Sequence, residues 1–401
     1  MMVLLIIILF VCVCDSGLAV ILVDSSHTIS EDTWKSTPEM IVAAGYQVES
    51  HYVTTSDGYI LGVHRIPQGR TSERKNETVL FVHGLFCSSS DAILFGPKKS
   101  PGYFFADKGY DVWIINVRGN TYSRNHTYFN PDTDAEFWNF SWHEIGTIDV
   151  PTVIDYILDV TGTDGVYYIG YSQGSTVFLV MTSIRPDYNA KVKVHIGLAP
   201  TVYMNNVRSP LLLTIASWSG ILESFLKLFG VNEFLAREGI GGNLIKILCS
   251  TNIGASLCES ILFSLCGSNP SQLNSSLVPL MMSHAPSGCS TNQVFHFLQL
   301  MLKGGFGQFD LGLEGNLEKY GAETPPQYDL SKITTPVYLF HGANDYLASK
   351  ADIDTLHEKF SSGVATKVLM EDSMWAHMDF VFGINASEVV YSKITDIFEK
   401  H

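Results

Sequence analysis

The chain has 401 residues, a length that allows one large core with a sizeable insertion, or several domains. Hydrophobic residues make up 46% of it and charged residues 16%, a composition typical of globular proteins and not of disordered ones. The formal net charge of −15 argues against partners that bind through positive charge, namely nucleic acids and anionic membranes, so contact with lipid requires apolar surface.

Residues 1–19 are predicted to form a secretory signal peptide. An apolar run extends from Met1 through Phe10 and ends before Asp15, and small residues follow at Gly17 and Ala19, after which we expect cleavage. The alternative is an N-terminal membrane anchor, but the run is shorter than the ~20 residues that span a bilayer. The mature chain is therefore expected to lack a transmembrane segment and to be secreted or lysosomal.

Short apolar runs rich in β-branched and aromatic residues occur in two parts of the chain, on either side of a different central segment. Runs of this kind suit strands that are buried on both faces of a mostly parallel sheet. The predicted strands are Thr78–Val82, Val112–Val117, Val166–Ile169, Val194–Leu198, Val337–Phe340 and Lys367–Met370. We therefore expect an α/β core formed by residues 20–200 and 329–401.

The central segment, residues 201–328, is predicted to be a mainly helical insertion. Pro210–Phe229 is strongly apolar with helical spacing, and Asn243–Leu248, Ala255–Cys266 and Asn292–Lys303 show the same spacing. Glu223 and Lys227 argue against a transmembrane reading of the first stretch. Helices inserted into a parallel sheet cover the carboxyl ends of its strands, so we expect a cap or lid over a site there.

The most informative motif is Gly170-Tyr171-Ser172-Gln173-Gly174, which lies between a predicted strand and a helical run. This is the context of the nucleophile elbow of the α/β-hydrolase fold, in which serine occupies a sharp, strained turn. Larger side chains at positions 170 and 174 would collide with the neighbouring strand and helix. The alternative is a tight strand–helix turn that has no catalytic role. A base and an acid elsewhere in the chain that could activate the serine make this alternative less favoured.

Ser172 needs a base to take its proton and a carboxylate to orient that base. In this fold the chain order is serine, acid, histidine. Asp345 follows a late predicted strand, and His377 lies further on, so we expect these two residues to complete a triad. Asp379 and His341 are the local competitors for the two roles.

An oxyanion hole requires two backbone N–H donors. Gln173, which follows the nucleophile, is expected to supply one, and the turn His83-Gly84-Leu85 after an earlier strand is expected to supply the other through Leu85. His143-Glu144 lacks the second histidine of the zinc-protease motif, and phosphate-binding and dinucleotide-binding loops are not found. We therefore predict neither a metal nor a cofactor.

The cysteines and glycosylation sequons are compatible with an oxidising compartment. Cleavage after Ala19 leaves five cysteines, an odd number, of which at least one pair is expected to form a disulfide. These are Cys87, Cys249, Cys258, Cys266 and Cys289. The Asn-x-Ser/Thr sequons, where surface glycans are expected, begin at Asn76, Asn125, Asn139, Asn274 and Asn385.

Several long motifs resemble the acid lipase family, which includes gastric and lysosomal acid lipases. The motifs are Ala44-Gly45-Tyr46, Thr55-Ser56-Asp57-Gly58-Tyr59-Ile60-Leu61, Asn116-Val117-Arg118-Gly119-Asn120-Thr121 and Phe137-Trp138-Asn139-Phe140-Ser141-Trp142-His143-Glu144-Ile145-Gly146. The resemblance covers nearly all of the mature chain. It implies an α/β-hydrolase with a helical cap that acts on neutral lipid esters, either triacylglycerols or cholesteryl esters.

The resemblance carries the family's functional residues onto matching positions. The catalytic residues fall on Ser172, Asp345 and His377, and the oxyanion donors on Leu85 and Gln173. The usual cap disulfide falls on Cys249 and Cys258. Tyr171 stands where the family usually has histidine, and Cys87 and Cys289 are unusual at their positions, so their roles stay open.

The expected reaction is transfer of an acyl group from a lipid ester to Ser172 and then to water, at a lipid–water interface. The alternatives are a carboxylesterase or phospholipase with the same triad, and a noncatalytic lipid-carrying protein. The last alternative is disfavoured because all three candidate triad residues are present. Acyl-chain length, pH optimum and oligomeric state do not follow from the sequence.

Overall fold

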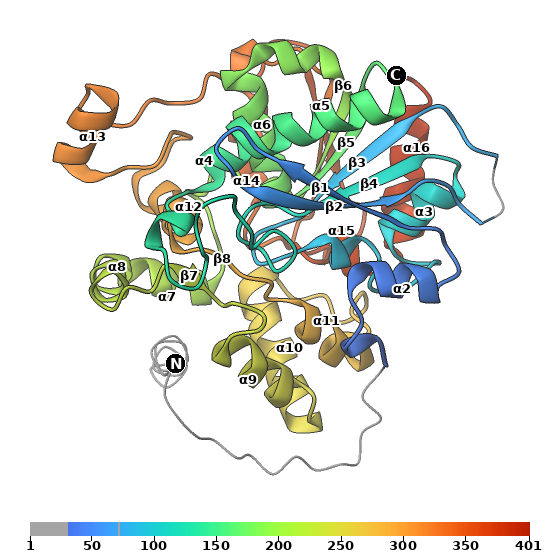
Figure 1. Ribbon diagram of the computed structural model, residues 1–401, viewed down its shortest axis with the longest axis horizontal. Helices are drawn as coiled ribbons and strands as arrows, with labels where there is room; N and C mark the ends of the chain where they lie inside the picture. Colours follow the sequence, from blue (N-terminus) through green and yellow to red (C-terminus); the bar gives the residue numbers. More distant parts are fainter. Residues whose placement is uncertain (1–30, 71–72) are drawn as a thin grey trace.

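The computed structural model describes residues 31–70 and 73–401. The predicted signal peptide therefore lies outside the described residues. Figure 1 shows a central twisted sheet with helices on both sides and a group of helices below it.

The central sheet has eight strands in the order β1-β2-β4-β3-β5-β6-β9-β10. β1 pairs with β2 and β2 with β4 in antiparallel fashion, whereas the remaining pairs are parallel. The bounds are β1 Glu49–Thr54, β2 Ile60–Ile66, β3 Thr78–Val82, β4 Asp111–Ile115, β5 Val166–Tyr171, β6 Val192–Leu198, β9 Val337–His341 and β10 Ala365–Leu369. The predicted α/β-hydrolase architecture is confirmed, and each predicted strand corresponds to one of these.

Helices cover both faces of this sheet. α5 and α6 lie on one side, and α3 and α16 on the other (Figure 1). The ring of Phe105 on α3 lies 5.7 Å from that of Phe398 on α16, which joins these two helices through aromatic packing. The helices outside the insertion are α2 Thr37–Ala43, α3 Pro101–Asp107, α4 Trp142–Glu144, α5 Val150–Thr161, α6 Gln173–Ile184, α14 Lys350–His357, α15 Asp379–Phe382 and α16 Ser392–Phe398.

Residues 201–328, between β6 and β9, form an insertion of helices with one short two-stranded sheet, β7 Glu233–Phe234 with β8 Cys289–Ser290. Its helices are α7 Pro210–Ser217, α8 Ser219–Leu228, α9 Ile240–Cys249, α10 Asn252–Cys266, α11 Val278–His284, α12 Thr291–Lys303 and α13 Gly312–Tyr320. α9, α10 and α11 form the lower group in Figure 1. Division of the chain into a core and an independent cap stays a prediction.

The stretch Pro210–Phe229 is helical, as its spacing predicts, but it is not one continuous helix. The chain forms α7 and α8 instead, and the break lies at Trp218, whose φ of −111° and ψ of 5° depart from helical values. Ser217, Trp218, Ser219 and Gly220 are all weak helix formers, so apolar spacing alone does not keep the helix continuous there.

In the part of the chain that the structure describes, no single helix is long and apolar enough to cross a membrane. Two consecutive helices, Gly241–Cys249 and Asn252–Cys266, are together long and apolar enough, but a bend of 114° separates them.

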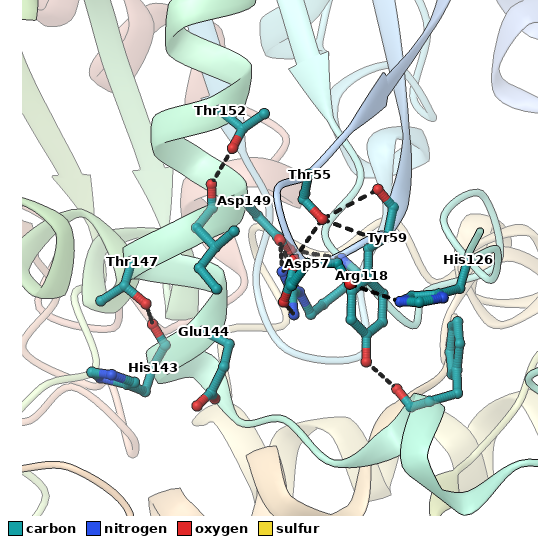
Figure 2. A network of polar contacts seen from close by, with 12 residues as sticks. Thr55, Asp57, Tyr59, Arg118, His126, His143, Glu144, Thr147, Asp149 and Thr152 are labelled. Atoms are coloured by element: carbon teal, nitrogen blue, oxygen red, sulfur yellow. Dashed lines mark hydrogen bonds and ion pairs between the residues drawn. The ribbon is translucent and has the colours of Figure 1, made fainter. Parts of the chain in front are cut away.

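A buried ion pair joins two of the motifs that carry the family resemblance to Asp149, which lies just after a third (Figure 2). The Arg118 guanidinium lies 2.6 Å from the Asp149 carboxylate and 2.7 Å from that of Asp57. Its Cζ lies 3.9 Å from the centre of the Tyr59 ring. Arg118 and Asp149 are fully buried, whereas the Asp57 side chain is 36% exposed. The network thus ties the β1–β2 turn, the loop after β4 and the π-helical turn Ile145–Asp149 together.

We expect Arg118→Met to lower the free energy of unfolding by about 3–5 kcal/mol, because Asp149 would be left as an uncompensated buried charge. Asp57→Asn serves as the control, and its expected cost is below about 1 kcal/mol because water screens an exposed pair. Urea unfolding followed by tryptophan fluorescence measures both. Equal losses for the two variants would contradict a dominant role of the buried pair.

Candidate active site

Ser172 lies in the turn between β5 and α6, at the carboxyl end of a central strand. Its φ of 52° and ψ of −115° place a non-glycine residue in a strained region of backbone space. A Cβ at Gly170 would lie 2.6 Å from the backbone of Gly174, and a Cβ at Gly174 would lie 2.1 Å from the carbonyl oxygen of Val82. Both positions of the predicted elbow therefore have no room for a side chain.

Asp345 and His377 lie in loops that follow β9 and β10, at the same edge of the sheet as Ser172. Asp345 is fully buried, and its Oδ1 accepts hydrogen bonds of 2.8 Å from the backbone amides of Leu347 and Ala348. These two bonds fix the orientation of the carboxylate. The other oxygen, Oδ2, lies 2.9 Å from His377 Nδ1, which is also 3.1 Å from Oδ1.

The structure brings the three predicted residues into one hydrogen-bonded chain. His377 Nε2 lies 2.9 Å from Ser172 Oγ, and both side chains are nearly buried. An ionised carboxylate only accepts, so Nδ1 carries the proton of the neutral imidazole and donates it to Asp345. Nε2 is then free to accept the hydroxyl proton of Ser172. This is the geometry that a general base needs.

The two competitors are placed differently. Asp379 Oδ2 accepts from the backbone amide of Ala376 at 2.8 Å and from Asn269 Nδ2 at 2.9 Å, and no bond joins it to the His377 ring. His341 Nδ1 is buried and has no hydrogen-bond partner among the described residues. Neither side chain is connected to Ser172 in the way that Asp345 and His377 are.

Burial raises the pKa of Asp379 to about 7, above its value in the unfolded chain. Its charge therefore costs stability above about pH 7, and this cost is absent below about pH 4. We expect Asp379→Asn to raise the melting temperature relative to the wild type more at pH 8 than at pH 5. Thermal unfolding of both proteins at the two pH values measures this, and a difference that does not change with pH would contradict it.

The turn after β3 lies beside the elbow, as expected for an oxyanion loop. A Cβ at Gly84 would lie 3.3 Å from the Cβ of Ser172. Within residues 31–70 and 73–401, the backbone amides of Leu85 and Gln173 have no backbone or side-chain acceptor. Gln173 is also the first residue of α6, where helix amides are unpaired and the dipole favours negative charge.

Comparison with known proteins decides the family. Residues 37–94 match the family model described as a partial α/β-hydrolase lipase region. Lipase 3 of Drosophila melanogaster is 41% identical over 359 residues, which cover 89% of this chain and 91% of that protein. Gastric triacylglycerol lipase of Rattus norvegicus is 35% identical and covers 89% of each chain. The chain belongs to the acid lipase family.

A solved structure agrees at the level of the fold. A soluble variant of monoglyceride lipase from Saccharomyces cerevisiae superposes with a TM-score of 0.54 at 14% identity, covering 88% of this chain and 95% of that one. This acid lipase is therefore an α/β-hydrolase that hydrolyses carboxylic esters.

Sequence reasoning missed Thr201 in this acid lipase. Its Oγ1 lies 3.2 Å from Ser172 Oγ and 3.3 Å from the carbonyl oxygen of Ala199. Thr201 follows β6, the strand next to β5, at the edge where Ser172 lies. The sequence does show that Thr201 directly follows a predicted central strand, but Thr201 belongs to no recognisable motif. A second neighbour is Tyr171, whose ring centre lies 5.5 Å from that of His377.

The cysteines of this acid lipase fall into two groups. Cys249 and Cys258 form a disulfide between α9 and α10, in agreement with the pairing that the resemblance implies. Cys87, Cys266 and Cys289 are free thiols. Burial raises the pKa of each free thiol, which disfavours the nucleophilic thiolate. None of the three is therefore an alternative nucleophile.

The end of α10 contacts both loops that hold the candidate acid and base. The carbonyl oxygen of Cys266 accepts from the amide of Tyr346 at 3.3 Å and from that of His377 at 3.2 Å. Since Cys258 lies on the same helix, the disulfide and the candidate triad are joined by one rigid element of the insertion.

The asparagines of the predicted glycosylation sequons are at least partly exposed to solvent. Asn76, Asn125, Asn139 and Asn385 are exposed, and Asn274 is half-buried. Glycosylation at these positions stays a prediction.

Proposed function

We propose that this acid lipase hydrolyses the ester bonds of neutral lipids, triacylglycerols or cholesteryl esters, with Ser172, His377 and Asp345 as its catalytic triad. The observation that carries the proposal is the hydrogen-bonded chain from Asp345 Oδ2 through His377 to Ser172 Oγ, with both bonds at 2.9 Å. The related rat enzyme is named a triacylglycerol lipase, which supports the substrate class.

In the proposed reaction, His377 Nε2 takes the proton of Ser172 as Oγ bonds to the ester carbonyl carbon. The amides of Leu85 and Gln173 stabilise the oxyanion that forms. The intermediate then expels the alcohol, which takes the proton from His377. A water molecule repeats these steps on the acyl-enzyme, which releases the fatty acid and restores the serine.

The surface of the insertion supports an insoluble substrate. Large apolar side chains are exposed along its helices and loops, although the molecule is acidic overall and cannot rely on charge to meet a lipid surface. The most exposed of them are Ile221, Leu228, Phe229, Ile253, Leu302 and Leu313. A lid of this kind can open where it meets lipid.

We further propose that the protein is secreted or delivered to lysosomes. The apolar segment within residues 1–19 and the sequons support this. The disulfide between Cys249 and Cys258 also supports an oxidising compartment, since disulfides are rare where thiols are kept reduced.

The test is release of fatty acid from emulsified triolein and from cholesteryl oleate between about pH 4 and pH 8, beside a short soluble ester. Release from either lipid supports the proposal, and the better substrate identifies the lipid class. Hydrolysis of the soluble ester alone would point to a carboxylesterase, and no hydrolysis of any of the three would point to a lipid carrier.

A further inference from the structure

His83 lies between β3 and the loop that contains Gly84 and Leu85, and it is buried with 2% of its surface exposed. Its Nε2 lies 3.3 Å from the backbone nitrogen of Val117 and 3.1 Å from Nδ2 of Asn120. Its Nδ1 lies 2.8 Å from the carbonyl oxygen of Gly84. Both ring nitrogens are therefore engaged, and no contact joins His83 to Ser172.

These contacts determine which ring nitrogen carries the proton. The Val117 amide can only donate. The Asn120 side chain is oriented because its Oδ1 accepts from the amides of Tyr122 at 3.0 Å and Ser123 at 3.1 Å, which leaves Nδ2 as a donor toward His83. His83 Nε2 is thus the acceptor, and Nδ1 holds the proton and donates it to Gly84. Burial lowers the pKa of His83 to about 4, which keeps the ring neutral above that pH.

The bond to Gly84 controls the direction of the Leu85 amide. The peptide bond between Gly84 and Leu85 is trans, because the cis bond in the described chain is Ala285–Pro286. In a planar trans peptide the C=O and N–H groups point in opposite directions. The Gly84 oxygen is held by His83 and by the amide of Cys87 at 3.3 Å, so the Leu85 N–H is turned to the opposite side, where no acceptor lies among the described residues.

The same loop is fixed against the elbow. A Cβ at Gly174 would lie 3.2 Å from the carbonyl oxygen of His83, and one at Gly84 would lie 3.3 Å from the Cβ of Ser172. Rotation of the Gly84–Leu85 peptide would therefore move the Leu85 donor relative to a serine that does not move with it. An oxyanion donor is useful only when it is directed at the oxyanion position before the reaction.

We propose that His83 is a positioning residue of the ester hydrolysis, which directs the Leu85 N–H into the oxyanion hole by holding the Gly84 carbonyl through its Nδ1 proton. Val117 and Asn120 select the required tautomer. The inference rests on the proposed function, because an oxyanion hole has a role only if acyl transfer occurs.

Two variants separate this role from simple packing. His83→Asn places an amide N–H near the position of Nδ1 and keeps a donor for Gly84. His83→Gln places its amide near the position of Nε2, where it can accept from Val117, but it leaves Gly84 without the side-chain donor. We expect His83→Gln to lose about 10²-fold in kcat, the size of effect seen when one oxyanion donor is removed, and His83→Asn to lose less than about 10-fold.

The readout is specific to the oxyanion. kcat and KM are measured with a soluble ester. The concentration of active enzyme is taken from titration of the reactive serine with a fluorophosphonate, so that unfolded protein does not lower the measured kcat. Affinity for a trifluoromethyl ketone, whose adduct with Ser172 carries an oxyanion, is measured beside it. In His83→Gln both kcat and ketone affinity are expected to fall by the same factor while KM stays unchanged.

His126→Gln is the matched control. His126 is also buried, its Nδ1 accepts from the amides of Tyr128 and Phe129, and its Nε2 lies 2.9 Å from the carbonyl oxygen of Asp57. Its replacement should lower the melting temperature without changing kcat or ketone affinity. A full kcat in His83→Gln, or equal losses in both His83 variants, would overturn the inference alone. A wild type that hydrolyses no ester would overturn the proposed function and the inference with it.

Discussion

Ser172→Ala is expected to lower kcat for a soluble ester by about 10⁶-fold, because loss of a triad nucleophile removes covalent catalysis altogether. Among the described residues, Ser172 is the hydroxyl that is hydrogen-bonded to the base. The hydroxyl of Thr201 lies 3.2 Å from Ser172 Oγ, and no bond joins it to His377. The side chain that remains at position 172 would be a methyl group, which fits the strained turn without a clash.

The measurement is the kcat of the purified variant on the soluble ester and on emulsified triolein. Ser183→Ala is the control, since Ser183 lies on α6, the helix that begins directly after Ser172, is buried, and donates to the carbonyl oxygen of Val180 at 3.0 Å. It removes a buried serine hydroxyl without touching the elbow, and full activity is expected. Ser172→Ala protein that folds normally and keeps more than a few per cent of activity would show that another residue is the nucleophile.

The core strands and the elbow could be predicted from the sequence because the signals are local. β3, β5 and β9 are short apolar runs, and burial on both faces of a parallel sheet requires such runs. The elbow depends on Gly170 and Gly174 at fixed distances from Ser172, so steric limits make it visible in five residues. Asp345 and His377 could be chosen because each follows a late strand in the order that this fold requires.

Other features depend on contacts between distant parts of the chain and have no local signal. Thr201 reaches Ser172 only because β6 pairs with β5, and a lone threonine after a strand is common. Arg118 is bound by Asp57 and Asp149, which lie 61 and 31 residues away. The break at Trp218 was missed for another reason, since apolar periodicity continues through it while helix propensity does not.

Asp345→Asn is expected to lower kcat by about 10⁴-fold, the cost of holding a triad histidine in the wrong tautomer. The backbone imposes this outcome. Oδ1 accepts from the amides of Leu347 and Ala348, so the oxygen of the asparagine side chain takes that position and its NH₂ group faces His377. The nearer contact of Nδ1, at 2.9 Å, then becomes a donor in place of an acceptor, which favours the tautomer with the proton on Nε2 over the 3.1 Å contact with Oδ1. In that tautomer Nε2 can no longer take the proton of Ser172.

The matched control is Asp379→Asn, because Asp379 lies two residues from the histidine, is buried, and loses a carboxyl group in the same substitution, yet bonds to Ala376 and Asn269 instead of the ring. We expect it to keep kcat within about 10-fold of the wild type, since the tautomer of His377 is not affected. kcat for the soluble ester at pH 7 is measured for both variants. The reverse order, with a large loss in Asp379→Asn and a small one in Asp345→Asn, would assign the carboxylate role to Asp379. The two variants thus separate a carboxyl group that lies near the base from one that accepts from Nδ1, and Asp345 is the residue that accepts from Nδ1 in this structure.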